Sequence, residues 1–352
     1  MYVDGGIIIT AKNPGIEMTT NRKHIPYSIL ELATVSNGST PAETFTKSLR
    51  LAQEAEAFGY SRFWLAEHHN AIGIASSATA VLIGYIAGGT KKIRVGSGGI
   101  MLPNHSPLIV AEQFGTLGSL YPNRIDLGLG RAPGTDQVTA QAIRSDRMQS
   151  VYRFPEEISL IQQYFSPANS IAKVRVTVAE GVNVPLYILG SSTDSAHLAA
   201  AKGLPYAFAS HFAPTHMFEA LNIYYNNFRP SEFLQEPYTI ACINVMAADT
   251  NEEAEKISTS LIRMFLAVFT GVSAYLQEPT EMTPELRGLL ENPALQQMLK
   301  YSFVGNRETV KKKTEDFLAQ TGVNEIMVVS NIYDHEDRVK SYRIFAEIMK
   351  EI

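Results

Sequence analysis

The chain has 352 residues, of which 45% are hydrophobic and 18% are charged, so it can form a sizeable buried core. Its formal net charge is -5 and it has no long basic stretch, which argues against nucleic acid as its main partner. No run of about 20 apolar residues predicts a membrane span. The single cysteine, Cys242, cannot form an internal disulfide, so we expect a cytoplasmic protein with Cys242 buried on a strand.

The first residues differ from the rest of the chain. Residues 1–17 lack a basic segment followed by a long apolar one, so they do not resemble a signal peptide. Met18 begins a sequence that is more typical of a soluble N-terminus. We therefore expect residues 1–24 to be an extension outside the fold, and residues 25–352 to form a single domain.

Eight apolar segments predict strands, and amphipathic stretches separate them. The helix predicted over residues 41–58 begins with Pro41 after Ser39-Thr40 and ends at Gly59. Strands that alternate with helices pair in parallel, so eight such units predict an α/β fold of the (β/α)8 TIM-barrel type. The predicted strands are 27–34, 62–67, 93–98, 124–129, 184–190, 205–209, 238–247 and 325–330.

A doubly wound open sheet is the alternative fold. Its nucleotide-binding form carries G-x-G-x-x-G after the first strand, and residues 35–39 lack this motif. Two later glycine pairs fail in the same way, because Met101 and Pro133 stand where the third glycine would fall. The sequence also contains neither a P-loop nor a G-x-S-x-G nucleophile elbow.

Two segments are too long to be simple connections. Residues 131–183 contain one predicted helix, over about 147–165, and an irregular tail. Residues 250–324 hold a helical excursion over 252–301, followed by a helix over 306–322. Long insertions at the C-terminal face of a barrel usually shape or cover the site. The excursion is therefore either a lid or an oligomer interface.

A polar sequence, Glu67-His68-His69-Asn70, directly follows the second predicted strand. Because side chains alternate along a strand, His68 and His69 cannot both point into the barrel. The motif does not match a metal site, and no H-E-x-x-H sequence or Cys cluster supports one. A single histidine in the barrel suits a general acid or base, whereas two structural histidines at a strand end are an equally good interpretation.

Small residues, hydroxyl groups and one arginine follow three of the later strands. Gly96-Ser97-Gly98-Gly99 permits the close approach of a flat ligand, or forms a simple bulge. Arg131 can bind a phosphate or form a surface ion pair. Ser191 and Ser192 begin a predicted helix, where they can help bind phosphate or act as an ordinary N-cap. The carboxylate of Asp194 opposes an anion at this helix start.

Taken together and in order, these motifs resemble the bacterial luciferase-like flavin monooxygenase family. The resemblance runs from about residue 28 to residue 349 and is strongest over 32–36, 64–70, 90–96 and 187–205. It implies a (β/α)8 barrel that binds reduced FMN, lets it react with O2 and inserts one oxygen atom into a small organic substrate. It also implies a separate flavin reductase as a partner and a homodimer.

Site residues follow from the resemblance at the matching positions. His68 is the implied catalytic acid or base, and a non-prolyl cis peptide between Gly98 and Gly99 is implied behind the flavin ring. Arg131, Arg153 and the serine turn are implied to bind the phosphate. The implied cofactor-binding residues are Ser97, Gly98, Gly99, Arg131, Arg153, Ser191 and Ser192, and no metal site is implied.

Two departures limit what the resemblance implies. Gly130 stands where the light-emitting luciferase subunit carries a reactive Cys, and Asp194 replaces a Thr of its phosphate turn. The long-chain aldehyde reaction is therefore not implied, and the chain is more similar to single-subunit members without an assigned substrate. A deazaflavin (F420)-dependent oxidoreductase and a non-catalytic flavin-binding relative remain alternatives.

Overall fold

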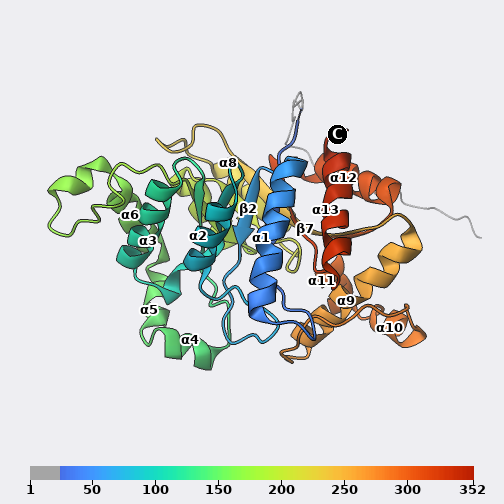
Figure 1. The fold of residues 1–352 in the computed structure, drawn as a ribbon. Helices are drawn as coiled ribbons and strands as arrows, with labels where there is room; N and C mark the ends of the chain where they lie inside the picture. The colour runs from blue at the N-terminus through green and yellow to red at the C-terminus, as the bar shows by residue number, and fades with distance from the viewer. Residues whose placement is uncertain (1–23) are drawn as a thin grey trace, which may run out of the picture.

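The alternating strands and helices fold into a closed barrel of eight parallel strands surrounded by helices (Figure 1). The computed structural model describes residues 24–352, and the predicted extension, except for its last residue, lies outside this range. The strands pair in the order β6-β5-β4-β3-β2-β1-β9-β7, and the pairing of β6 with β7 closes this ring. The prediction of a (β/α)8 barrel is confirmed.

All eight predicted strands are present within a few residues of their predicted bounds. The barrel strands are β1 (Tyr27–Glu31), β2 (Arg62–Leu65), β3 (Arg94–Met101), β4 (Ile125–Gly130), β5 (Leu186–Gly190), β6 (Tyr206–Phe208), β7 (Thr239–Ala247) and β9 (Glu325–Val329). A ninth strand, β8 (Ser302–Gly305), pairs only with the last four residues of β7. This strand was not predicted, because four residues are too few to show a strand pattern.

Helices surround the barrel and also extend beyond one end of it. They are α1 (Pro41–Phe58), α2 (Thr79–Gly89), α3 (Pro107–Leu120), α4 (Gln137–Ile143), α5 (Arg147–Tyr152), α6 (Phe154–Phe165), α7 (Thr193–Lys202), α8 (Met217–Asn227), α9 (Asn251–Phe269), α10 (Pro284–Leu289), α11 (Pro293–Leu299), α12 (Arg307–Thr321) and α13 (His335–Met349), with 3-10 turns η1 (Leu102–Asn104) and η2 (Pro167–Ile171). No helix among residues 24–352 is long and apolar enough to cross a membrane.

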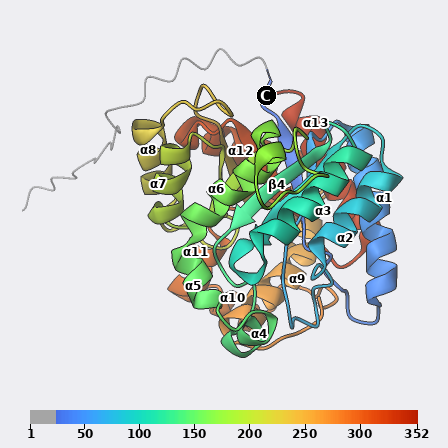
Figure 2. The same cartoon turned by 90° about the vertical axis from the view of Figure 1, so that its left-hand side faces the viewer.

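The α1 helix has the predicted bounds and the predicted caps. Thr40 and Glu43 form a capping box at its start, and Gly59 ends it in the left-handed conformation with φ 94°. Both views show α4 and α10 at the end of the molecule opposite the C-terminus (Figures 1 and 2). This is the end at which the barrel strands finish, and we call it the mouth.

The predicted single helix over about 147–165 is wrong. It is divided into α5 and α6 at Arg153, because Pro155 has no N–H and its ring clashes with the carbonyl of the preceding turn. The same insertion contains α4, which was not predicted. The helical excursion predicted over 252–301 is also interrupted: α9 ends at Phe269, and residues 270–283 form no helix.

The barrel has two apolar regions because each strand is buried on both faces. One lies between the strands and the helices, and the other fills the lumen. Cys242 lies in the lumen group, where burial raises the pKa of its thiol, so it is a protonated core residue as predicted. The lumen residues are Leu30, Leu32, Trp64, Ala66, Tyr187, Ala207, Ile240, Cys242, Met327 and Val329.

Charged side chains close the barrel at the end opposite the mouth. Arg62 donates to Asp126 at 2.8 Å and to Glu325 at 3.0 Å, which joins β2 to β4 and β9. Arg94 Nε donates to Asp126 at 2.9 Å, and the Tyr238 hydroxyl donates to Glu325 at 2.6 Å. Both carboxylates are fully buried, so each charge is balanced inside the protein.

Replacing Arg62 with Met should therefore leave two buried carboxylates short of a partner and lower the free energy of unfolding by about 3–5 kcal/mol. Urea unfolding measures this loss. The matched control is Arg50→Met, because Arg50 pairs with Glu336 on the surface, where a salt bridge contributes about 0–1 kcal/mol. Equal losses in the two variants would contradict a stabilising role for the buried network.

Candidate active site

His68 follows β2 at the mouth of the barrel. Trp64 and Ala66 belong to the lumen group, so the alternation of side chains directs His68 to the lumen as well. Glu67 and His69 point to the other side, where His69 Nε2 lies 2.8 Å from Glu67 Oε1. The contact of His69 with Glu67 places His69 away from the lumen group, so the two histidines do not both point into the barrel.

The imidazole of His68 is uncharged at neutral pH. Burial lowers the pKa of His68; the Glu67 carboxylate raises it in part, and His69 lowers it further. Its Nδ1 is buried and has no hydrogen-bond partner in the described part of the chain. A neutral ring of this kind can accept a proton or pass one on.

The Glu67 carboxylate connects the end of β2 to the end of β3. It accepts the backbone N–H of Met101 at 2.9 Å and a side-chain N–H of Asn104 at 3.1 Å. His105 Nε2 lies 2.9 Å from its Oε1. Burial alone would raise the pKa of Glu67, but the bonds from His105, His69 and Met101 lower it to about 2. The carboxylate therefore stays ionised.

Arg147 extends this network to the loop after β4. Its Nε donates to Asn104 Oδ1 at 3.0 Å, and its Nη2 donates to the Arg131 carbonyl at 3.2 Å. The backbone of Arg131 is thus connected through Asn104 to Glu67. The positioning roles of Glu67 and Arg147 were not predicted; the one signal for them in the sequence is a carboxylate directly after a buried strand.

The β3 strand contains the Gly98–Gly99 peptide bond, which is cis, as the resemblance implies. Its pairing with β4 shifts register after Ser97. A Cβ on Gly98 would come within 2.6 Å of Leu30 Cδ1, and one on Gly99 within 2.8 Å of the Gly128 carbonyl oxygen. Position 99 therefore needs glycine, since the backbone that a side chain there would meet cannot move aside, and both glycines leave this edge of the mouth without side chains.

The Ser97 hydroxyl is bound to β4. It donates to the Gly128 carbonyl at 2.8 Å and accepts the Gly128 N–H at 3.0 Å, and Ser97 is fully buried. These bonds bridge the two strands where their register shifts. A cofactor-binding role for Ser97 is therefore restricted to its backbone.

Arg131 reaches the start of α7. Its Nη2 lies 3.1 Å from Asp194 Oδ2 in the first turn of that helix, and both side chains are exposed. Ser192 is the N-cap residue, but its side chain makes no capping hydrogen bond. A guanidinium beside N–H groups that no side chain caps is an arrangement that can bind an anion such as a phosphate group. The Asp194 carboxylate opposes that anion.

The turn that carries Ser191 and Ser192 is tight. The Ser195 hydroxyl folds back and donates to the Ser192 carbonyl at 2.7 Å. A Cβ on Gly190 would come within 2.1 Å of Ser195 Oγ, so only glycine fits before the two serines. The structure thus brings Arg131 and the serine turn to one edge of the mouth.

Arg153 lies at the break between α5 and α6. Its side chain is exposed and makes no hydrogen bond or ion pair with residues 24–352, although its charge acts on the nearby carboxyl groups of Asp146 and Glu157. Nothing in the described part of the chain links it to Arg131. Unlike Arg131, Arg153 is not positioned by a side-chain contact.

Residues 270–283, between α9 and α10, lie beside the mouth. The Leu276 N–H donates to the Val35 carbonyl at 2.9 Å, and the Asn37 N–H donates to the Leu276 carbonyl at 2.8 Å. A Cβ on Gly73 would come within 2.1 Å of the Ala274 carbonyl oxygen, so this segment also packs on the loop after β2. It is anchored on the loops after β1 and β2, a position suited to covering the mouth.

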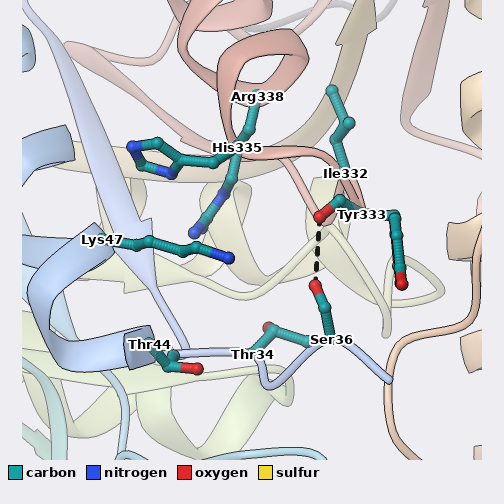
Figure 3. Close-up of a pocket in the computed structure, with 8 residues that line it drawn as sticks. All are labelled: Thr34, Ser36, Thr44, Lys47, Ile332, Tyr333, His335 and Arg338. Atoms are coloured by element: carbon teal, nitrogen blue, oxygen red, sulfur yellow. Dashed lines mark hydrogen bonds between the residues drawn. The ribbon is translucent and has the colours of Figure 1, made fainter. Parts of the chain in front are cut away.

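A small recess lies where the loop after β1 meets the start of α13 (Figure 3). The Ser36 hydroxyl donates to the Tyr333 carbonyl at 3.0 Å, and the Lys47 amine extends toward Arg338. Its volume of about 270 Å³, which includes space open to solvent, is below the usual size of a cofactor pocket. The recess lies between the loops after β1 and β9, and Arg131 is not among the residues that line it.

The structure is a (β/α)8 barrel whose mouth carries a candidate anion site at Arg131 and a neutral histidine, His68. The family described as luciferase-like monooxygenase matches residues 25–325. The chain belongs to this family and is an oxidoreductase.

Three curated relatives show the range of similarity. The chain is 51% identical to the uncharacterized protein YvbT of Bacillus subtilis and 46% identical to a luciferase-like monooxygenase of Escherichia coli strain K12, each over 94% of this chain and 98% of the relative. It is 32% identical to an N-acetyl-S-alkylcysteine monooxygenase of Bacillus subtilis, over 92% of this chain and 98% of that relative.

Solved structures agree with the fold. Apo-MsnO8 has a TM-score of 0.84 and 34% identity, over 92% of this chain and 98% of that one. Two structures at 16% identity share the fold alone. A type II Baeyer-Villiger monooxygenase from Pseudomonas putida in complex with FMN has a TM-score of 0.68, over 93% and 98% of the two chains. An F420-dependent secondary alcohol dehydrogenase has a TM-score of 0.66, over 91% and 97%.

Replacing Glu67 with Gln should destabilise the protein by about 2–3 kcal/mol near pH 6, because the amide cannot replace an ionised acceptor. The lowered pKa of Glu67 means that its ionised form stabilises the fold above the pKa of the unfolded chain. This stability is lost as the pH falls toward about 2.

The difference in the free energy of unfolding between wild type and Glu67→Gln, measured in urea, should therefore shrink by roughly 2 kcal/mol between about pH 6 and pH 3. Glu281→Gln is the control, because Glu281 pairs with Lys256 on the surface. A difference that stays constant over this range would show that the pKa of Glu67 is not depressed.

Proposed function

We propose that the protein is a flavin-dependent monooxygenase that uses reduced FMN and O2 to oxygenate a small organic substrate. The observation that carries this proposal is the anion site of Arg131 and α7, which lies at the same mouth as the uncharged His68. Relatives named as monooxygenases at 46% and 32% identity support it. A separate flavin reductase would supply the reduced FMN, since the sequence has no dinucleotide-binding fingerprint.

The phosphate would be held at one edge of the mouth. Arg131 would pair with it, and the N–H groups at the start of α7, near Ser191 and Ser192, would donate to it. Arg153 is exposed and unpaired within residues 24–352, so it would add a second positive charge without losing an existing bond. The Gly98–Gly99 edge offers the flavin ring a surface that has no side chains.

Reduced FMN, when bound, supplies the electrons that activate O2, and that chemistry belongs to the cofactor. The protein supplies binding, proton transfer and the exclusion of water. Nδ1 of His68 is buried, so we assign proton transfer to its other ring nitrogen, Nε2. Residues 270–283, anchored on Val35 and Asn37, would cover the mouth.

The first substrates to test are suggested by one relative. The Bacillus subtilis relative at 32% identity is named for N-acetyl-S-alkylcysteine. Such a compound has a thioether sulfur that can accept one oxygen atom, and it has an acetamide group. We therefore choose N-acetyl-S-benzylcysteine as the first candidate substrate.

We also propose that the protein is a homodimer. The neighbouring helices α2 and α3 expose four large apolar side chains, of which Val81 is 72% exposed and Leu120 is 63% exposed. Tyr85 and Ile109 are the other two. An apolar face of this kind on a two-helix surface is suited to a second copy of the chain.

Replacing Arg131 with Met should weaken FMN binding roughly tenfold to a hundredfold, because a charge-assisted hydrogen bond to phosphate is lost. Asp194→Asn should strengthen binding about two- to fivefold, because it removes an exposed ion pair that competes with the phosphate. Fluorescence titration with FMN measures both changes.

Riboflavin, which has no phosphate, is the control ligand, and its affinity should change little in either variant. Arg307→Met is the control protein, because Arg307 pairs with Glu351 on the surface. Equal losses of riboflavin and FMN affinity would show that Arg131 does not bind the phosphate.

Stopped flow tests the proposed reaction. Anaerobic protein with reduced FMN is mixed with oxygenated buffer, and the return of oxidised FMN absorbance is followed. We expect this return to be delayed relative to free reduced FMN, and to quicken when a substrate consumes the oxygen. His68→Ala should slow substrate oxygenation and keep FMN affinity, whereas His216→Ala, a change at an exposed histidine, should alter neither.

A return at the rate of free flavin would reject the monooxygenase proposal. Tight binding of F420 together with substrate oxidation would then indicate the deazaflavin-dependent oxidoreductase. Bound flavin without any turnover would indicate a flavin-binding protein.

A further inference from the structure

Three buried polar atoms at the mouth have no hydrogen-bond partner in the described part of the chain. They are Nδ1 of His68, Nδ1 of His211 and Oδ1 of Asn244, which lie at or after β2, β6 and β7. An unpartnered buried polar atom costs about 1–3 kcal/mol, so a group of them marks a place where a ligand can bind.

His211 lies across the lumen from His68. The strands β2 and β6 are four positions apart in a ring of eight, so their ends are diametrically opposed. Burial lowers the pKa of His211 to about 3, and His68 contributes to this shift, which places the two rings within electrostatic reach. Both imidazoles are therefore uncharged at neutral pH.

Asn244 positions the turn that carries His211. Cys242, two residues earlier on β7, faces the lumen, so Asn244 faces the lumen one step nearer the mouth. Its Nδ2 donates to the His211 carbonyl at 2.6 Å and to Ser302 Oγ at 3.2 Å. A carbonyl only accepts, so these bonds fix the orientation of the amide and leave Oδ1 as its free acceptor.

We propose that His211 contacts the substrate on the wall opposite His68, and that this wall binds an uncharged hydrogen-bonding group such as a carboxamide. The inference rests on the proposed function and specifies the substrate class. His211 and Asn244 carry no charge, so a carboxylate has no cation to bind on this wall. A carboxamide both donates and accepts, which matches a neutral imidazole beside an amide oxygen.

The His211 ring is accessible to such a ligand. The residue is only partly buried, and the ring of Phe212 packs edge-on against it at a centroid distance of 4.8 Å. A half-turn about the Cβ–Cγ bond exchanges the buried and exposed edges of the ring, because this torsion is broad and roughly two-fold. Phe212, which is 45% exposed, gives an aromatic substrate an apolar neighbour.

Ligand-observed NMR tests the proposed binding to His211 and Asn244 with two aromatic probes of similar size. N-methylbenzamide is uncharged, and benzoate carries a carboxylate. Each is titrated into the protein with oxidised FMN bound, at neutral pH. We expect N-methylbenzamide to bind about tenfold or more tightly than benzoate. Equal affinities, tighter binding of benzoate, or no binding of N-methylbenzamide would overturn the proposal.

Variants then locate the binding. His211→Phe keeps the ring and removes both nitrogens, so N-methylbenzamide affinity should fall about tenfold. His211→Gln keeps an uncharged polar group and should restore most of the affinity. Asn244→Leu should weaken binding by displacing the turn, and His216→Phe, on the same loop, should match wild type. Wild-type affinity in His211→Phe would remove His211 from the site.

The outcome is separate from that of the proposed function, because the titration needs neither O2 nor turnover. Selective amide binding in a protein that fails the stopped-flow test would reject the monooxygenase and keep the recognition site. The delayed return of FMN absorbance without amide selectivity would keep the monooxygenase and reject the recognition site.

Discussion

One buried carboxylate organises the mouth of this barrel. Glu67 is 1% exposed, yet it stays ionised because two histidines, a backbone N–H and the Asn104 amide surround it. These bonds connect the segment after β2, which carries His68, to the end of β3. That end lies just after the cis peptide bond between Gly98 and Gly99. Through Asn104 and Arg147 the same network reaches the backbone of Arg131. The proposed proton-transfer residue and the proposed phosphate ligand thus both depend on a single buried anion.

The chemistry of the lumen changes along the barrel axis. Paired charges around Arg62 close one end, apolar side chains such as Trp64 fill the middle, and uncharged polar groups line the mouth. The charge balance at the closed end lets ionic groups be buried without unpaired charge. At the mouth the positive charge of Arg131 lies toward the α7 edge, away from the line between His68 and His211. The proposed anion site and the proposed site for a neutral ligand therefore occupy separate regions of the mouth.

Much of the fold could be predicted from the sequence, because parallel strands buried on both faces appear as continuous apolar runs. The bounds of α1 were also predictable, since its capping box and C-terminal glycine are local signals. Predictions failed where the structure of a segment depends on contacts with residues that are distant in the sequence. The four residues of β8 become a strand only by pairing with the end of β7. Residues 270–283 are not helical, and they form backbone hydrogen bonds with the loop after β1, which lies more than 200 residues earlier in the chain.

The sequence by itself determined the eight-strand barrel, the glycines at 98 and 99, and the chemical types of His68, Arg131 and the serine turn, because strand burial and short motifs are local properties. Only the tertiary structure decided which of these side chains meet. In the folded protein the Ser97 hydroxyl bonds to β4, and Asp194 pairs with Arg131. His211 lies across the lumen from His68. The physical reason is that barrel closure brings the ends of distant strands to one mouth, and the partners there are separated by tens to hundreds of residues in the chain.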